Sequence, residues 1–493
     1  MKIKFVKVLL FAFTTAVAGA NTPSYDSYRE KMSGEFERFK KNALSEYESF
    51  RKKANDDYAE FLKRSWEQFD ALKSPHKPKD DKPVPPKPYQ EDETPIKDTP
   101  LPFKDIVKPQ PPEPQPLPVK PIEPVTVVDE WHKFSFYGTD MKVRLAKNMR
   151  FTLKGCDGNA IAAGWKILSQ QKYNNLINDC LEIRKDCGLC DWGYLMMLRE
   201  MSRSFMGGDC NEARLLMAYV YCQSGYKMKL ANSKKRLYML YASRHVMYDN
   251  SYFLIDGANY YPLDCDEDRI YVNDASFPNE QPLSLYMARI PKLGVENTPD
   301  RQLSSKRYAE ANAVVSTNKN LIEFYGTYPA SEVGNNFMTK WAMYANTPIS
   351  DQARLSLYPR LKNSISGKTQ QQSVEILLNF VQTAFVYGYD SKIWGYDRAF
   401  FADETLFYPY SDCEDRSILF SRLVRDLVGL SVVLVYYPGH LATAVEFSTM
   451  VKGDYLSIDG RKFVVCDPTY IGAPVGRTMP DMDNSVAKVI LLE

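Results

Sequence analysis

The sequence predicts an α+β protein in which two similar globular domains follow a long helical arm and a proline-rich linker. Three observations support this prediction. Aromatic residues repeat every 11 positions near the N-terminus, 17 of the 31 prolines follow in one stretch, and one order of cysteine, histidine and aspartate occurs twice in the rest of the chain. A chain of 493 residues is too long for one hydrophobic core, so several domains are expected.

The charge of the chain gives no sign of a polyanionic partner. The formal net charge is +2, and 25% of the residues are charged, with both signs in nearly equal number. A nucleic-acid-binding protein usually concentrates positive charge to neutralise phosphates. We therefore expect no nucleic-acid partner.

Residues 1–20 have the pattern of a cleavable signal peptide. Three lysines precede an apolar run over residues 8–17, and Ala18-Gly19-Ala20 follows. The run is too short to span a bilayer, and no transmembrane segment is expected elsewhere. The sequence thus predicts an exported protein that is periplasmic, at the cell surface or secreted.

Residues 21–74 predict one long helix with an apolar stripe. The stripe has three rows at an 11-residue period: Tyr25, Phe36, Tyr47, Tyr58 and Phe69; Tyr28, Phe39, Phe50, Phe61 and Leu72; Met32, Ala43, Ala54 and Ser65. This period is about 3.67 residues per turn, which favours a straight or slightly right-handed coiled coil. Because isolated aromatic stripes are unfavourable in water, we expect self-association or a protein partner through this helix.

Residues 75–125 predict a linker, because their prolines favour an extended polyproline conformation. At about 3.1 Å per residue the linker would reach at most roughly 150 Å. We expect it to act as a semi-rigid spacer that holds the helix away from the globular part of the chain.

Two globular domains are expected at 126–295 and 296–493. In the first, helical patterns over 192–225 precede strand patterns over 236–247 and 252–263. In the second, helical patterns cover 335–346, 349–365 and 370–387, and the strand patterns 431–437, 440–446 and 462–467 come later.

Cys413 stands at the start of a predicted helix in the second domain. Asp412 is a good N-cap, apolar residues recur at helical spacing after it, and Gly429 ends the pattern. The N–H groups and dipole at a helix start favour the thiolate form of a cysteine. His440 begins the second predicted strand after this helix, and Asp467 ends a later strand. The three residues therefore predict a nucleophile, a base and a residue that orients the base.

A second set of the same residues lies in the first domain. Cys210 opens a predicted helix after Gly208-Asp209, His245 follows an apolar run, and Asp264 ends a predicted strand. In both sets the aspartate lies seven residues after the glycine of Ile-Asp-Gly, and Trp-Gly-Tyr precedes the cysteine by 18 or 19 residues. The sequence predicts that the two sets superpose, with a second possible site at Cys210.

Residues 408–476 resemble the transglutaminase-like branch of the papain-like cysteine enzymes. The resemblance rests on Cys-Glu-Asp-Arg at 413–416, on His440 and on Asp-Pro-Thr-Tyr at 467–470. It implies two papain-like domains, each with a cysteine-bearing helix on an antiparallel sheet. Many members have His-Ala-Trp where this chain has His440-Leu441-Ala442, so the second donor to the oxyanion is open: Trp394 or Tyr396 could supply it, although each also fits a core position.

The resemblance implies a thiol enzyme in which Cys413 attacks an amide, His440 acts as general base and Asp467 orients the imidazole. The acyl group of the thioester could be transferred to water or to an amine, so peptide hydrolysis and acyl transfer both stay open. The alternative is an inert protein of the same fold that binds a peptide strand, because each of the three residues alone also fits a structural role.

No cofactor or metal ion is expected. The chain has nine cysteines, and Cys187 and Cys190 form a single C-x-x-C motif without a second pair of ligands. A disulfide among Cys156, Cys180, Cys187 and Cys190, or simply buried thiols, is the preferred interpretation.

Overall fold

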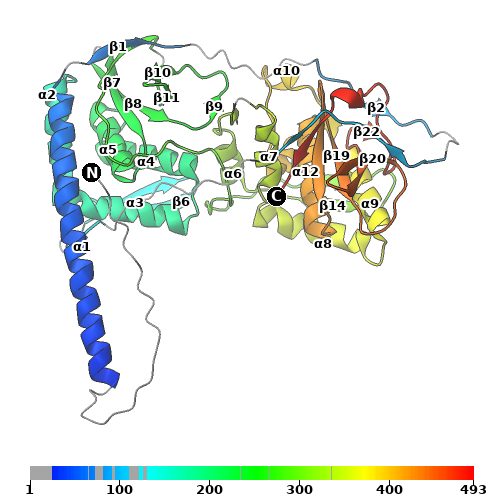
Figure 1. The fold of residues 1–493 in the computed structure, drawn as a ribbon, viewed down its shortest axis with the longest axis horizontal. Coiled ribbons are helices and arrows are strands. Elements are labelled where there is room, and N and C mark those ends of the chain that lie inside the picture. The colour runs from blue at the N-terminus through cyan, green and yellow to red at the C-terminus, as the bar shows by residue number, and fades with distance from the viewer. Residues whose placement is uncertain are drawn as a thin grey trace. The chain divides into compact units, whose positions relative to one another are not determined.

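The computed structural model describes residues 25–64, 66–72, 82–91, 95–109, 122–125, 130–233, 235–265, 267–334 and 336–493 (Figure 1). They belong to two compact units that meet between Arg51 and Lys52. The predicted signal peptide, residues 1–20, lies outside the described part. Within that part, no helix combines the length and the apolar character needed to cross a bilayer.

Helix α1 (Tyr25–Leu62) is the helix that the 11-residue repeat predicts. It ends at Leu62 instead of near residue 74, and the chain continues as strand β1 (Glu67–Asp70). In the first unit, the aromatic side chains of Phe36, Phe39 and Phe50 on α1 are exposed.

The last turns of α1 belong to the second unit and are packed there. Tyr58 is 3% exposed, and its ring lies 4.5 Å from that of Trp165 in helix α2 (Gly158–Leu168). The indole N–H of Trp165 donates to the side chain of Asn55 over 3.0 Å. The prediction of one uninterrupted helical arm over 21–74 is therefore wrong. The stripe's C-terminal part is covered by α2, and Phe69 lies in a strand.

The first large sheet has six strands in the order β1-β12-β7-β8-β11-β10, and all neighbouring pairs are antiparallel. Besides β1, its strands are β7 (Met228–Ser233), β8 (Arg236–Ala242), β10 (Phe253–Ile255), β11 (Ala258–Pro262) and β12 (Arg269–Val272). The helices after α2 are α3 (Asn174–Asp186), α4 (Asp191–Met206) and α5 (Asn211–Gln223). Helix α5 packs on β8 and β7.

The second large sheet has seven strands in the order β3-β20-β21-β19-β18-β23-β4. Its central strands are β18 (Val432–Tyr437), β19 (His440–Glu446), β20 (Asp454–Ile458), β21 (Arg461–Cys466) and β23 (Lys488–Leu491), and they pair antiparallel. Helix α12 (Cys413–Leu427) packs on β19 and β18. The chain is therefore an α+β protein with antiparallel central sheets, which confirms the predicted fold class at this level.

The two sheets share the order of five strands. Starting from β12, the first sheet runs β12-β7-β8-β11-β10; starting from β23, the second runs β23-β18-β19-β21-β20. In each sheet a helix precedes these strands in the chain and packs on the second and third strands of this order. Helix α5 packs on β7 and β8, and helix α12 packs on β18 and β19. The repeated sequence pattern thus coincides with a repeated arrangement of elements.

The described part of the proline-rich stretch contributes three short strands, of which two extend the second large sheet and one forms a separate two-stranded sheet. Its strands are β2 (Lys87–Pro88), β3 (Thr99–Pro100) and β4 (Asp105–Val107), and they pair in parallel with β22 (Tyr470–Ile471), β20 and β23. We call residues 82–109 the proline-rich strap. The prediction of a free spacer is wrong for the strap, because its strands pair with other strands. Proline is tolerated in these strands because an edge strand does not need an N–H donor on both sides.

Apolar side chains hold the strap against the sheet. Leu101, Phe103 and Ile106 pack on the core cluster of β18 to β23, and Val107 is 4% exposed. At the other end, Val84 donates its N–H to the carbonyl of Gly439 over 2.8 Å. The strap therefore reaches from the sheet edges to the turn that precedes His440.

The remaining elements connect these sheets. The strands are β5 (Trp131–Phe136), β6 (Thr139–Arg144), β9 (Val246–Met247), β13 (Arg301–Ser304), β14 (Asn312–Val315), β15 (Ser331–Glu332), β16 (Val386–Tyr387) and β17 (Tyr410–Ser411). The helices are α6 (Lys319–Tyr325), α7 (Thr339–Asn346), α8 (Asp351–Ile365), α9 (Gln370–Ala384), α10 (Asp390–Ile393) and α11 (Ala402–Phe407), and the short 3-10 helices are η1 (Lys147–Met149), η2 (Gln171–Tyr173) and η3 (Asn484–Val486).

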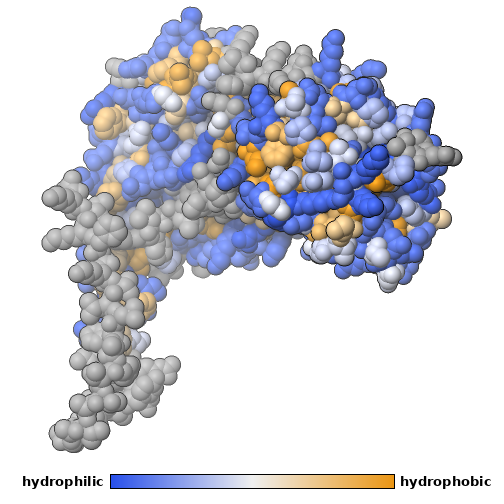
Figure 2. All heavy atoms as spheres, turned by 45° about the vertical axis from the view of Figure 1, so that its right-hand side comes forward, coloured by the Kyte–Doolittle hydropathy of each residue, from blue (hydrophilic) through white to orange (hydrophobic). Residues whose placement is uncertain are grey.

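The face seen in Figure 2 is mostly hydrophilic, with patches of hydrophobic residues among the hydrophilic ones. None of the nine cysteines, all of which lie in the described part of the chain, forms a disulfide. Of the two interpretations offered for Cys156, Cys180, Cys187 and Cys190, the structure therefore contains the one without a disulfide.

Candidate active site

Cys413 is the first residue of α12 and is held there by a capping box. Asp412 accepts a hydrogen bond from the backbone N–H of Asp415, and the side chain of Asp415 accepts one from the N–H of Asp412. Both carboxylates are buried, and the Cys413 residue is 5% exposed. The cap fixes the thiol at the start of a buried helix, where the sequence predicts it.

His440 and Asp467 meet through the pairing of two neighbouring strands. His440 begins β19, and Asp467 directly follows the last residue of β21. The Nε2 atom of His440 lies 2.8 Å from Oδ2 of Asp467, and both side chains are almost completely buried. The structure thus brings together the predicted base and the residue predicted to orient it.

The loop after β21 fixes Asp467 independently of His440. Its second oxygen, Oδ1, accepts hydrogen bonds from the N–H and the hydroxyl of Thr469, both over 2.8 Å. Although burial alone would raise the pKa of Asp467, the contacts with His440 and Thr469 hold it below the usual value. The carboxylate is therefore ionised, as an orienting group for an imidazole must be.

Gln382 is a further residue that holds this loop, and the sequence analysis missed it. It lies in α9 and is 1% exposed. Its amide donates to the carbonyls of Asp467, Tyr470 and Ala473 over 2.8 to 3.1 Å. A glutamine inside a helical pattern carries no sequence signal of this role, since its partners follow some 85 residues later in the chain.

The other imidazole nitrogen of His440, Nδ1, makes no hydrogen bond to the thiol of Cys413, which bonds to Glu414 instead. Nδ1 is buried and has no hydrogen-bond partner among the described residues. His440 and Cys413 line the same cleft, which has a volume of about 390 Å³. A neutral imidazole that donates its Nε2–H to Asp467 presents a lone pair at Nδ1, which is the form that a base requires.

The thiol itself differs from the sequence prediction. Burial, together with the neighbouring carboxylates of Glu414 and Asp412, raises the pKa of Cys413 well above its usual value. Its S–H group donates to Oε2 of Glu414 over 3.2 Å. The expectation of a thiolate favoured by the helix start is therefore wrong for the unliganded cleft, because nearby negative charge and desolvation outweigh the helix dipole.

We expect Glu414→Gln to lower the pKa of Cys413, since the substitution removes a negative charge next to sulfur. One pKa unit is about a tenfold change in the thiolate fraction below the pKa, so alkylation of Cys413 by iodoacetamide at neutral pH should become several-fold faster. The measurement is the alkylation rate against pH, followed by mass spectrometry of the Cys413 peptide. Glu310→Gln, an exposed glutamate outside the cleft, is the control; an unchanged pH profile for Glu414→Gln would contradict this account.

Acidic residues form one wall of the cleft. Carboxylate oxygens of Asp390, Asp397 and Glu414 lie within 4.8 Å of one another, close enough to share a cation. Lys340, a residue that is 4% exposed, forms an ion pair with Asp397. Burial and the charges of Glu414 and Asp397 raise the pKa of Asp390 to about 8, so this carboxyl group keeps its proton at neutral pH unless a cation approaches it.

Aromatic residues and the strap form the rest of the wall. Trp341, which lies in α7, contacts the ring of Tyr436 at 5.5 Å, and its buried indole N–H has no acceptor in the described part of the chain. Tyr396 also lines the cleft, whereas Trp394 packs edge-on against Tyr408 at 4.9 Å. Of the two donors considered from the sequence, only Tyr396 reaches the cleft, and Trp341 was not identified.

The residues of the first set are not assembled. Cys210 is the N-cap of α5 and is partly exposed. The carboxylate of Asp264 forms ion pairs with Arg199 at 2.9 Å and Arg203 at 2.6 Å. No hydrogen bond joins Cys210, His245 and Asp264 to one another in the described chain, and the carboxylate of Asp264 is bound by arginines and not by an imidazole.

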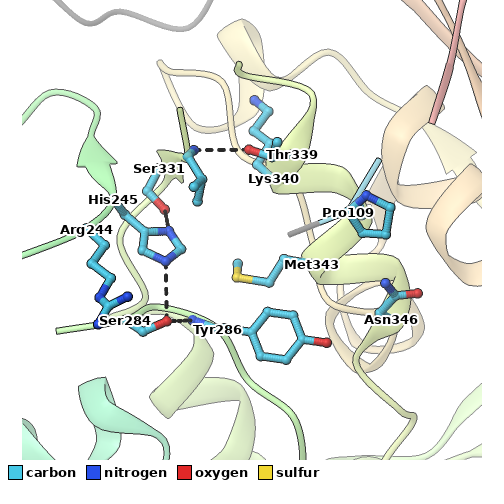
Figure 3. A pocket seen from close by; sticks show the side chains of 12 residues that line it. Pro109, Arg244, His245, Ser284, Tyr286, Ser331, Thr339, Lys340, Met343 and Asn346 are labelled. Atoms are coloured by element: carbon cyan, nitrogen blue, oxygen red, sulfur yellow. Dashed lines mark hydrogen bonds between the residues drawn. The ribbon is translucent and has the colours of Figure 1, made fainter. Parts of the chain in front are cut away.

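His245 lies in a different cavity (Figure 3). Its Nδ1 is 3.4 Å from the hydroxyl of Ser331, and its Nε2 is 3.5 Å from the hydroxyl of Ser284. Burial, and then the charge of Arg244, lower its pKa to about 4. This histidine is neutral, directly precedes β9 in the chain and lies between the hydroxyl groups of Ser284 and Ser331.

Strand register explains why His245 does not match His440. His440 lies three residues before the partner of the last residue of β21. The same position in the first sheet is Leu237, three residues before Leu240, which pairs with the last residue of β11. His245 instead follows the far end of β8. The first set therefore lacks a base where the second has one.

Comparisons with known proteins add no assignment to this geometry. No protein-family model matches the chain, and neither a curated protein nor a solved structure matches it.

Proposed function

We propose that this protein is an exported, transglutaminase-like cysteine enzyme that attacks amide bonds through Cys413, His440 and Asp467. One observation carries the proposal: Cys413 lines the same cleft as an imidazole whose Nε2 is bound by a buried carboxylate and whose Nδ1 has no hydrogen-bond partner among the described residues. Nucleophilic catalysis by a thiol uses a base that a carboxylate orients in this way.

The reaction follows from these positions. Nδ1 of His440 takes the proton of the Cys413 thiol as sulfur attacks the carbonyl carbon, and the carbonyl π electrons move to oxygen. When the tetrahedral intermediate collapses, the C–N bond breaks, and the imidazolium returns its proton to the leaving amine. The acyl-thioester then reacts with water or with an amine. We favour hydrolysis, since water is always available to an exposed cleft, and acyl transfer is the alternative.

Trapping of the acyl-enzyme tests this proposal. Full-length mature protein is mixed with amidated peptides, quenched in acid within milliseconds to seconds, and analysed by intact-mass spectrometry. We expect a mass gain equal to the acyl part of the peptide, located at Cys413 and removed by hydroxylamine, which cleaves thioesters. A mass gain at another residue, or none with any peptide library, would refute the enzymatic proposal.

An inert binding domain is the second candidate. The raised pKa of Cys413 and the hydrogen bond from its thiol to Glu414 favour it, because both stabilise the unreactive thiol. An inert domain would bind peptides in the cleft without forming a thioester. The same trapping experiment separates the two candidates.

We also propose that the N-terminal helix mediates self-association. The side chains of Phe36, Phe39 and Phe50 are 63%, 70% and 49% exposed, and burial of half of each ring would contribute on the order of 1 to 2 kcal/mol. Phe39→Glu with Phe50→Glu should return an oligomer to the monomer in sedimentation experiments at tens of micromolar.

Ser45→Glu with Ser49→Glu is the matched control for this test. It adds the same two charges at exposed positions on the opposite face of α1. We expect the control to sediment like wild type. If the wild-type protein is already a monomer under these conditions, self-association is refuted, and the stripe must serve another protein.

A further inference from the structure

The cleft at Cys413 is lined by more acidic side chains than basic ones. Its lining contains five carboxylates and one ammonium group: Asp249, Asp390, Asp397, Asp412 and Glu414, with Lys340. His440 is the second basic side chain of the lining. A substrate that enters this cleft therefore meets a mainly acidic wall near the nucleophile, and a cation would favour the ionised form of its carboxyl groups.

Cationic side chains in the neighbourhood do not balance these acidic side chains. Lys340 pairs with Asp397, and the guanidinium of Arg398 is directed to Glu404, which does not line the cleft. Asp390 accepts from the backbone N–H of Arg398 over 2.6 Å, which is a neutral donor. Glu414 accepts a hydrogen bond from the S–H group of the nucleophile, which is a weak donor.

Two buried polar atoms in the same cleft indicate a ligand. Within the residues that the structure describes, the indole N–H of Trp341, a residue that is 6% exposed, has no acceptor, and Nδ1 of His440, a residue that is 2% exposed, has no partner. Buried donors and acceptors are rarely left unpaired. A carbonyl group and the reacting thiol would satisfy them, and the aromatic lining of Trp341, Tyr389 and Tyr396 also suits a cation.

We propose that the substrate carries an ammonium or guanidinium group next to the amide that Cys413 attacks, and that Asp390, Asp397 and Glu414 bind this group. The inference rests on the proposed function and adds its substrate class: a polypeptide with a lysine or arginine beside the scissile bond. A neutral or acidic neighbour would leave the carboxylates uncompensated or add repulsion.

Binding of such a group also acts on the nucleophile. A cation beside Glu414 offsets the negative charge that opposes ionisation of the thiol, and it competes with the S–H group for the carboxylate. The correct substrate would thereby help to release the proton of Cys413 to His440. A substrate without the cation would lose rate as well as affinity.

Equilibrium binding to the Cys413→Ala variant of the full chain tests the inference without turnover. The probes are three acetylated, amidated alanine pentapeptides with a central lysine, norleucine or glutamate. Isothermal titration calorimetry at low salt should give at least tenfold tighter binding for the lysine peptide than for the norleucine peptide, and weakest binding for the glutamate peptide. Equal affinities, or no binding of the lysine peptide, would overturn the inference.

Asp390→Asn in the same background is the sharper variant. Its amide oxygen can still accept from the N–H of Arg398, so helix α10 is preserved while one charge is removed. We expect the preference for lysine over norleucine to fall several-fold. Asp351→Asn removes an exposed charge outside the cleft and should leave it unchanged. An unaltered preference in Asp390→Asn would contradict the assigned wall.

The two proposals fail in distinguishable ways. If acyl-enzyme is trapped but lysine and norleucine peptides bind and react equally, the enzymatic proposal stands and the substrate class is wrong. If the lysine peptide binds selectively but no thioester forms at Cys413, the cleft recognises cations in an inert domain.

Discussion

Replacing Cys413 by alanine is expected to abolish thioester formation and turnover while the protein stays folded. The thiol is 5% exposed at the start of a capped helix, so its removal leaves only a small gap there. Loss of a nucleophile in a triad lowers kcat by about 10⁴-fold or more. His440→Ala should give a comparable loss, and the double variant should be no worse than either single one, because the two residues act as one unit.

Cys210→Ala is the control for this prediction. Cys210 is also at a helix start, but no base stands at the position that matches His440. Its replacement should leave turnover unchanged. Asp467→Asn should retain part of the activity, since Asp467 orients the base without reacting. Full turnover in Cys413→Ala, with a folded protein by circular dichroism, would refute the assignment of the nucleophile.

Deleting the proline-rich strap, residues 82–109, is expected to destabilise the second sheet severely. The deletion removes β3 and β4 from its two edges and uncovers the cluster on which Leu101, Phe103 and Ile106 pack. Each such side chain contributes about 1.5 to 3 kcal/mol when fully buried. The summed loss approaches the 5 to 15 kcal/mol that typically stabilises a whole domain. Calorimetry should show loss of the corresponding transition, and light scattering should show aggregation.

Deletion of residues 25–51 is the matched control, because these residues belong to the other unit. Similar in length, this deletion should leave the melting temperature of the second sheet unchanged. A milder variant, Phe103→Ala, should lower that temperature by several degrees, in proportion to the partial burial of its ring. If the strap deletion melts like wild type, the strap is dispensable and its pairing contributes little.

Local elements near Cys413 could be predicted from the sequence because local signals determine them. The N-cap at Asp412 and the helical spacing of apolar residues predict α12, and the strand patterns over 431–437 and 440–446 differ from β18 and β19 by at most one residue. Alternating or continuous apolar runs with a Pro-Gly turn between them leave few other pairings.

The first set of residues shows what spacing cannot predict. The number of residues between Cys210 and His245 is similar to that between Cys413 and His440. His245, however, follows the end of β8, whereas the matching position is near the start of β8. Sequence distance counts residues, whereas a site depends on which end of a strand a residue occupies. The repeat was detectable, yet the register that separates Leu237 from His245 depends on pairing with β11.

The chemistry of the cleft was also beyond the sequence, because distant segments create it. The carboxylates of Asp390 and Asp397 and the side chains of Lys340 and Trp341 come from α10, α7 and the loop after α10. No local pattern marks them as neighbours of Cys413. A helix-start argument alone gave the wrong direction for the thiol pKa because it omitted these charges.

Pairing of the strap with the last strand has a consequence for how the chain is made. Ile106 of β4 pairs with Val489 of β23, four residues from the end of the sequence. At roughly 5 to 20 residues per second, a ribosome needs on the order of 20 to 80 s to synthesise the intervening chain. During that interval β4 has no partner, because β23 has not yet been synthesised. Nascent chains should therefore depend on holding factors until β23 has been synthesised, and a chain that stops before Lys488 should leave β4 without its partner.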